Sequence, residues 1–256
     1  MRDVTYCTVG STELKLDLYY PKSRTGVTQL VIFIHGGGLS KGDKRGGEGM
    51  LDVPSLLDAG FTVASLNYRL APEYKFPTMI QDVKCAVRFL RAHANEYKID
   101  ANKIGVWGSS AGGLLVNLLG TTDSRAGFDV GEYLDQSSRV QAVVDMFGPA
   151  DLTVDFSSAF IELKAQAMTG FDLVQASPVT HVTPDDPPFL ILQGDVDRVV
   201  PLSQSQSFYN KLASAGVNAE LVVVHGGPHG LAAPNQSPSR AELTNRIVKF
   251  FEDHLK

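Results

Sequence analysis

The chain has 256 residues, of which 43% are hydrophobic and 20% are charged. These values are close to those of average globular proteins and exclude a disordered or fibrous chain, and the length suits one α/β domain over residues 1–256. The formal net charge of -5, without a basic stripe, argues against a nucleic-acid-binding protein.

Predicted strands and helices alternate along the chain. Leu14, Leu16 and Leu18 alternate with polar residues, which predicts a half-buried strand that ends at Pro21. Apolar runs predict further strands at 30–34, 61–66, 103–107, 140–147, 188–192 and 221–224. Apolar residues at helical spacing predict helices over 79–94 and from Ser239 onward. This order predicts an α/β fold with a mostly parallel central sheet of about eight strands flanked by helices.

The stretch 148–186 does not follow this alternation. Its apolar residues are scattered among Asp, Ser and Pro, and connections of this length are usually functional or contain short helices. We expect a small lid insertion. Its large apolar side chains are Phe156, Phe160, Met168 and Phe171, too few to line a deep tunnel, which predicts a shallow pocket.

The two cysteines, Cys7 and Cys85, fall in a predicted strand and a predicted helix. We interpret both as small buried apolar residues and expect neither a disulfide nor a thiolate metal site. The segment 1–5 lacks the features of a signal peptide, and no stretch approaches the ~18 apolar residues of a membrane span. We therefore expect a cytoplasmic protein without a membrane partner.

A Gly-X-Ser-X-Gly motif, Gly108 to Gly112, lies between a predicted strand and a predicted helix. In this setting Ser110 is the candidate nucleophile, because a strained turn lifts its hydroxyl clear of the sheet. The helix that follows directs unpaired N–H groups and a positive dipole end at the site. A glycine- and serine-rich turn without a catalytic role is the alternative.

The motif His35-Gly36-Gly37-Gly38 directly follows an apolar strand. Bare glycine backbone can present N–H groups to a forming oxyanion, and in the α/β-hydrolase fold one such donor comes from this loop. Gly37 and Gly38 are our candidates, together with Ala111 after the serine. A phosphate-binding loop is disfavoured, because no Lys-Ser or Lys-Thr follows at the required spacing. We interpret His35 as a brace for the loop.

Candidate acids and bases follow the serine in the chain order of this fold. Asp195 and Asp197 come just after the predicted strand 188–192, and their spacing leaves both open as the acid. His225 and His229 follow the last predicted strand. We favour His229 as the base, because it lies in a glycine-lined loop where its ring can swing over the sheet edge.

Together these motifs resemble those of known esterases. The segments that carry the resemblance are 35–38, 67–73, 108–113 and 176–181. They are similar to bacterial hormone-sensitive-lipase-like esterases, and more so to the compact bifunctional acetylxylan and feruloyl esterase group. The resemblance covers nearly the whole chain. It implies an α/β-hydrolase fold, with the second aspartate of the turn, Asp197, as the acid and the histidine of the final His-Gly pair, His229, as the base.

The resemblance also implies a serine carboxylesterase, with acetylated or feruloylated sugars among the candidate substrates. The shallow pocket predicted for the segment 148–186 favours short acyl esters, acetyl to butyryl. Its two-step acyl transfer requires neither a metal nor an organic cofactor, and the partner is a small-molecule ester. A homodimer is compatible with the sequence. The alternatives are an arylformamidase or amide hydrolase with the same apparatus, and a binding protein without activity on the same scaffold.

The chain departs from the family pattern at three places. Leu39 stands where an aromatic residue is common, and Ser109 where aspartate is common. The predicted sheet also begins without a preceding helical cap. These differences leave the chemistry intact but bear on the substrate, and the missing cap predicts an open site.

Overall fold

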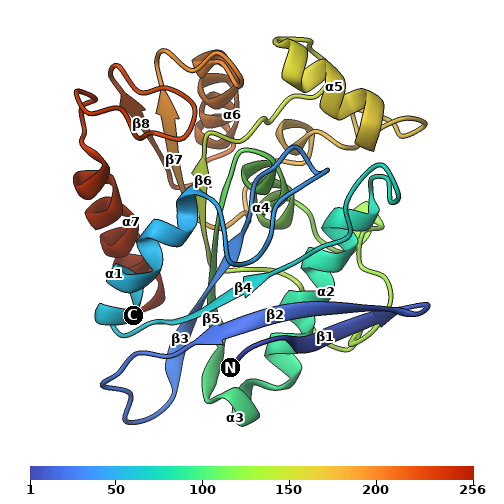
Figure 1. The fold of residues 1–256 in the computed structure, drawn as a ribbon, viewed down its shortest axis with the longest axis vertical. Coiled ribbons are helices and arrows are strands. Elements are labelled where there is room, and N and C mark those ends of the chain that lie inside the picture. The colour runs from blue at the N-terminus through green and yellow to red at the C-terminus, as the bar shows by residue number, and fades with distance from the viewer.

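The computed structural model describes residues 1–256, apart from the side chain of Glu48. It contains an eight-stranded sheet in the order β1-β2-β4-β3-β5-β6-β7-β8 (Figure 1). The strands are β1 (Val4–Val9), β2 (Thr12–Tyr19), β3 (Thr28–Ile34), β4 (Thr62–Leu66), β5 (Ile99–Ser109), β6 (Ala142–Met146), β7 (Phe189–Gly194) and β8 (Ala219–Val224). The pairs β1–β2 and β2–β4 are antiparallel and the others are parallel. The predicted sheet is confirmed.

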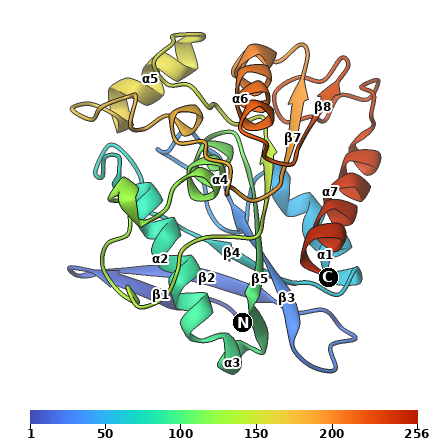
Figure 2. The ribbon, with the colours of Figure 1, turned by 180° about the vertical axis from the view of Figure 1, so that it is seen from behind.

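Helices cover both faces of the sheet (Figures 1 and 2). Helices α2 (Thr78–Ala92), α3 (Ala94–Tyr97), α4 (Ala111–Thr121) and α6 (Leu202–Ser214) lie on one face, and α1 (Val53–Asp58) and α7 (Arg240–Leu255) on the other. Alternating residues of β3 show why: Ile32 packs into one core cluster and Phe33 into the other. Among the helices in the described part of the chain, none is long and apolar enough to cross a bilayer.

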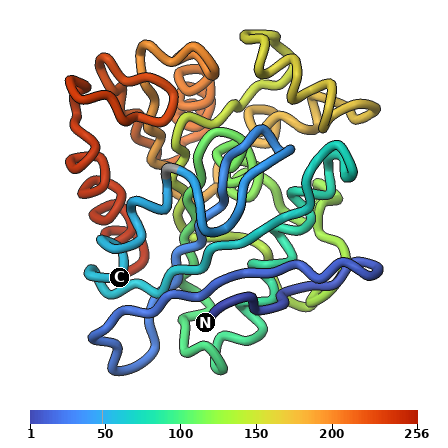
Figure 3. The backbone as a smooth tube through the Cα atoms, viewed as in Figure 1, coloured from blue at the N-terminus to red at the C-terminus, as the bar shows by residue number. Residues whose placement is uncertain are grey.

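The segment 148–186, where we predicted a lid insertion, contains α5 (Ser158–Ala167) and the short 3-10 helix η3 (Pro178–Thr180). It lies at one edge of the molecule (Figure 3), beyond the carboxyl ends of the parallel strands (Figure 1). Met168 is buried in the core, and the ring of Phe171 packs edge-on against Phe76 at 4.7 Å. Core packing therefore uses two of the four apolar side chains that were candidates for a pocket wall.

The interpretation of the cysteines as unpaired is wrong. Cys7 in β1 and Cys85 in α2 form a disulfide, with their Cα atoms 6.5 Å apart. Both residues are buried, as expected. The pairing depends on α2 packing against β1, which brings together residues 78 positions apart in sequence, so that neither local pattern could predict it.

Candidate active site

Ser110 lies at the tight turn between β5 and α4. Its backbone has φ 55° and ψ -118°, a region that costs energy for a residue with a side chain. The glycines of the motif allow the end of β5, the start of α4 and the end of β3 to lie close together. A Cβ on Gly108 would lie 2.5 Å from the carbonyl oxygen of Gly112, and a Cβ on Gly112 would lie 2.1 Å from that of Ile34. The sequence thus forms a strained turn that presents the Ser110 hydroxyl.

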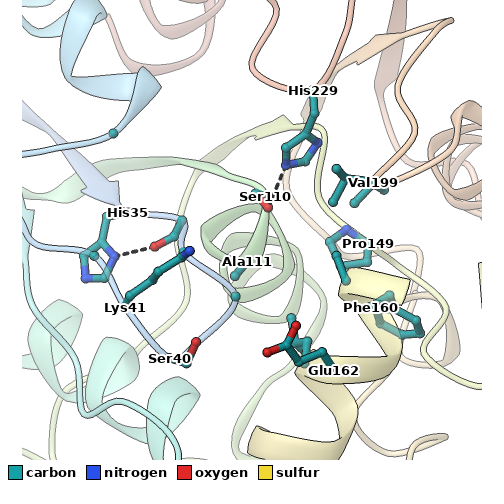
Figure 4. A pocket seen from close by; sticks show the side chains of 18 of the residues that line it. His35, Ser40, Lys41, Ser110, Ala111, Pro149, Phe160, Glu162, Val199 and His229 are labelled. Atoms are coloured by element: carbon teal, nitrogen blue, oxygen red, sulfur yellow. Dashed lines mark hydrogen bonds between the residues drawn. The ribbon is translucent and has the colours of Figure 1, made fainter. Parts of the chain in front are cut away.

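The structure brings Ser110, His229 and Asp197 together. Nε2 of His229 lies 3.0 Å from Oγ of Ser110 (Figure 4). Its Nδ1 lies 2.8 Å from Oδ2 of Asp197. A carboxylate can only accept, so Nδ1–H of a neutral ring donates to Asp197 and Nε2 is left as the acceptor for the serine hydroxyl. This arrangement can transfer a proton away from Ser110.

Four donors hold the carboxyl group of Asp197. Besides His229, the backbone N–H groups of Val199 and Val200 donate to Oδ1 at 2.8 and 3.0 Å, and the Gln193 amide donates to Oδ2 at 3.1 Å. Burial raises the pKa of Asp197, but the hydrogen bond and charge of His229 and the two backbone donors outweigh it, so the pKa lies below its ordinary value. Asp197 therefore stays ionised.

The two remaining candidates, Asp195 and His225, form a separate pair. Nδ1 of His225 lies 3.0 Å from Oδ2 of Asp195, and the N–H of Gly226 donates to Oδ1 at 2.7 Å. The hydrogen bond from His225 lowers the pKa of Asp195. The side chain of His225 is 76% exposed, whereas that of His229 is 24% exposed. The structure thus contains an outer pair, Asp195 and His225, and an inner pair, Asp197 and His229. Only the inner pair contacts Ser110.

Successive carbonyl groups of the glycine loop are held by hydrogen bonds. The oxygen of His35 accepts from the Tyr68 hydroxyl at 2.9 Å, and that of Gly36 accepts from Nδ1 of His35 at 2.7 Å. The oxygen of Gly37 accepts from two backbone N–H groups at 3.1 and 3.2 Å. The C=O and N–H of a trans peptide point in opposite directions, so these bonds also fix the N–H groups of Gly37 and Gly38.

His35 braces this loop from inside. Its ring is buried and stacks on Tyr68 with centroids 4.4 Å apart. Burial lowers the pKa of His35, despite the hydrogen bond to the Gly36 carbonyl, which raises it. The ring is therefore a neutral Nδ1–H donor. The role of Tyr68 was not predicted from the sequence, and its place in the 67–73 motif was the only available signal.

Phe147 is a second residue that the sequence did not identify. It follows β6 with a positive φ of 47°, and its ring packs edge-on against His229 with centroids 4.7 Å apart. This contact supports one side of the imidazole ring. A positive φ at a phenylalanine has no local sequence signature, so this contact could not be predicted from the sequence.

A cavity of about 600 Å³ opens onto Ser110. Its walls include the three candidate oxyanion donors, Gly37, Gly38 and Ala111. Apolar side chains contributed by the segment 148–186 and by the loop 195–201, which carries Asp197, include Phe156, Phe160, Leu163, Val199 and Val200. Polar side chains that line the cavity include Ser40, Lys41, Asp43, Glu162 and Gln166. Within the described residues, no cluster of three or more His, Cys, Asp or Glu is placed to hold a metal ion.

Comparison with known proteins extends this picture. The family model described as BD-FAE matches residues 16–212. The chain is 32% identical over 198 residues to the probable carboxylic ester hydrolase LipM of Mycobacterium tuberculosis, covering 73% of this chain and 46% of that protein. It is 31% identical to esterase LipC of the same organism, covering 84% and 56%. The chain therefore spans about half the length of the curated relatives it matches.

Solved structures of esterases match over most of the chain. A truncated carbohydrate esterase from gut microbiota has a TM-score of 0.83 at 31% identity, covering 99% of this chain and 95% of that one. An acetyl ester-xyloside bifunctional hydrolase from Caldicellulosiruptor lactoaceticus has a TM-score of 0.80 at 28% identity, covering 94% and 88%. These similarities confirm the expected α/β-hydrolase fold and the resemblance to esterases.

Proposed function

Because this chain belongs to the BD-FAE family, we propose that it is a serine carboxylesterase that hydrolyses short-chain acyl esters. The observation that carries the proposal is the hydrogen-bonded series from Ser110 through His229 to the ionised Asp197. This series opens into a cavity that is also lined by the glycine loop. Residues 1–256 act as a single hydrolase domain in this proposal.

The reaction proceeds in two steps. Nε2 of His229 takes the proton of Ser110 as Oγ attacks the acyl carbonyl carbon, and Asp197 stabilises the imidazolium that forms. The N–H groups of Gly37, Gly38 and Ala111 receive the oxyanion. His229 then gives the proton to the departing alcohol, which leaves the acyl group on Ser110. In the second step His229 takes a proton from water, which attacks the acyl-enzyme, releases the carboxylic acid and restores the Ser110 hydroxyl.

The alcohol part of the substrate is an acylated sugar in this proposal. Two structural relatives are named as a carbohydrate esterase and as an acetyl ester-xyloside hydrolase. Glu162 and Gln166 of α5 and Ser40 of the glycine loop line the cavity and offer donors and acceptors to sugar hydroxyl groups. The ester is the only partner required, and neither nucleic acid nor a membrane surface takes part.

The disulfide changes the expected location. The sequence led us to expect a cytoplasmic protein, but disulfides persist mainly in oxidising compartments. The buried Cys7–Cys85 bond therefore favours an oxidising compartment, and we include that location in the proposal.

The proposal is tested with acetyl esters of two different alcohols and with a matched ester and amide pair. Nitrophenyl acetate, an acetylated xyloside, and an aryl formate with its matched aryl formamide are assayed with the wild type and Ser110→Ala. We expect turnover of both acetyl esters and of the formate, with little cleavage of the formamide and no significant activity in the variant. Faster cleavage of the formamide than of the formate would instead identify an amide hydrolase.

A further inference from the structure

A buried carboxyl group that the proposed mechanism does not use lies below the active site. Asp145 is in β6, two residues before Phe147, and has no exposed surface. Its Oδ2 accepts from the Asn117 amide at 2.7 Å, and its Oδ1 accepts from the N–H of Gly148 at 2.8 Å. Asn117 belongs to α4, so one side chain joins this helix to the turn that follows β6.

This junction is tightly packed. A Cβ on Gly113, in the first turn of α4, would lie 2.5 Å from Oδ1 of Asp145 and 2.6 Å from the Cα of Gly148. Only glycine therefore fits at position 113 of α4. The helix that begins directly after Ser110 is thus held against the end of β6 at a fixed distance.

The same turn contacts both reacting residues. The N–H of Ser110 donates to the carbonyl oxygen of Met146 at 2.9 Å. Phe147, held between Asp145 and Gly148, packs against the ring of His229. A shift of this turn would therefore move Ser110 and His229 relative to each other.

On this basis we propose that Asp145 is a positioning residue for the reaction. It fixes α4 and the 146–148 turn together, and so sets the distance between Oγ of Ser110 and Nε2 of His229. The inference rests on the proposed function for the identity of the reaction, and on the contacts of Asp145 for the geometry.

Asn117 provides a way to separate positioning from charge. Its Oδ1 is buried without a hydrogen-bond partner among the described residues. If the Asn117 side-chain amide flips, its Oδ1 faces residue 145 and can accept a hydrogen bond from the amide of an asparagine there. Asp145→Asn can therefore keep both connections, to Asn117 and to Gly148, whereas Asp145→Ala keeps neither.

The test measures kcat and KM for nitrophenyl acetate in Asp145→Ala, Asp145→Asn and Asn117→Ala. The matched control is Asp52→Ala. Asp52 is also a buried carboxyl that joins two elements, through Arg240 and Thr244 of α7 at 2.7 Å each, but none of its contacts reaches the site. Thermal unfolding gives the folded fraction of each variant.

We expect Asp145→Ala to lower kcat about 10- to 100-fold with KM nearly unchanged, because small displacements of reacting groups cost this much. Asp145→Asn should recover most of the loss, and Asn117→Ala should be intermediate. Asp52→Ala should lower the melting temperature but keep kcat per folded molecule. Equal kcat in Asp145→Ala and Asp52→Ala would overturn the proposal, as would an asparagine variant no better than alanine.

A second measurement does not depend on substrate. The proton on Nδ1 of His229 that bonds to Asp197 is followed by NMR in the folded variants. We expect its signal to shift or broaden in Asp145→Ala and to stay in place in Asp145→Asn and Asp52→Ala. An unchanged signal in Asp145→Ala would contradict the inference even if the wild type cleaved no ester, while missing ester cleavage alone would reject only the proposed function.

Discussion

Asp195 and Asp197 lie two positions apart in one turn, yet their surroundings differ. Asp197 is enclosed by four donors, while Asp195 meets an exposed histidine and one backbone N–H. We expect Asp197→Asn to lower kcat by up to about 10⁴-fold, because the tautomer and the imidazolium of His229 both depend on the carboxylate. Asp195→Asn is the matched control and should lower kcat only slightly.

Steady-state kinetics of the two variants at one pH check this assignment. If Asp195→Asn is the inactive variant and Asp197→Asn keeps its activity, the outer pair rather than the inner pair serves Ser110.

Asp145 should make stability depend on pH. Burial, opposed by the bonds from Asn117 and Gly148, raises its pKa from 3.8 to about 7. The folded state thus binds the proton more tightly than the unfolded state, so this contribution is full below pH 3.8 and is lost as the pH rises through about 7. The free energy of unfolding that is lost over this pH range is on the order of 4 kcal/mol.

Urea unfolding at about pH 5 and about pH 8 measures this effect. The wild type should lose more unfolding free energy between the two conditions than Asp145→Asn, whose side chain does not titrate. Equal losses in the two proteins would show that the carboxyl has no raised pKa.

The helix α5 and the loop 195–201 contribute the apolar walls of the acyl pocket. Phe156 and Phe160 stack with centroids 4.0 Å apart and line the cavity beside Val199. Each buried methylene is worth about 0.8 kcal/mol, and this gain ends where the acyl chain reaches water. We therefore expect kcat/KM to be highest for acetyl to butyryl esters, and assays of nitrophenyl acetate, butyrate, octanoate and palmitate measure this. A maximum at octanoate or beyond would mean that the insertion encloses a deep channel.

The chain between α4 and β6 shows what local patterns miss. Residues 122–141 contain only the short 3-10 helix η2 (Ser124–Ala126). Two fully buried cations of α2 hold this segment: Lys84 donates to Asp129 and to the carbonyl of Thr122, both at 3.0 Å, and Arg88 donates to Asp129 at 2.6 Å. Helical spacing predicted α2 from its apolar face, but ion pairs with a distant loop have no local signature.

At the scale of the whole molecule, the disulfide links β1 to α2 across 78 residues. Closing a loop of this length lowers the entropy of the unfolded chain, which adds about 4 kcal/mol to the free energy of unfolding. We expect reduction, or Cys7→Ala with Cys85→Ala, to lower the melting temperature by about 10 °C. Thiol alkylation with mass spectrometry is the check: the unreduced protein should carry no alkyl group and the reduced protein two. Two alkyl groups before reduction would contradict the pairing.

Much of this architecture could be predicted because its signals are local. Buried parallel strands such as β3 are continuous apolar runs, and the turn at Ser110 requires glycines at fixed positions. The disulfide and the contacts of Asp145 and Phe147 could not be predicted, because they join segments whose proximity is decided by packing. The choice between Asp195 and Asp197 needed the family resemblance, since spacing alone leaves both carboxyl groups in one turn.

Labelling with an organophosphate shows whether Ser110 is the nucleophile. We expect a single adduct on Ser110 in the wild type, formed as esterase activity is lost, because only this hydroxyl has His229 as its base. Ser110→Ala should take up no label and keep at most about 10³- to 10⁴-fold catalysis over water. An adduct on Ser109, or an alanine variant with wild-type turnover, would show that Ser110 is not the nucleophile.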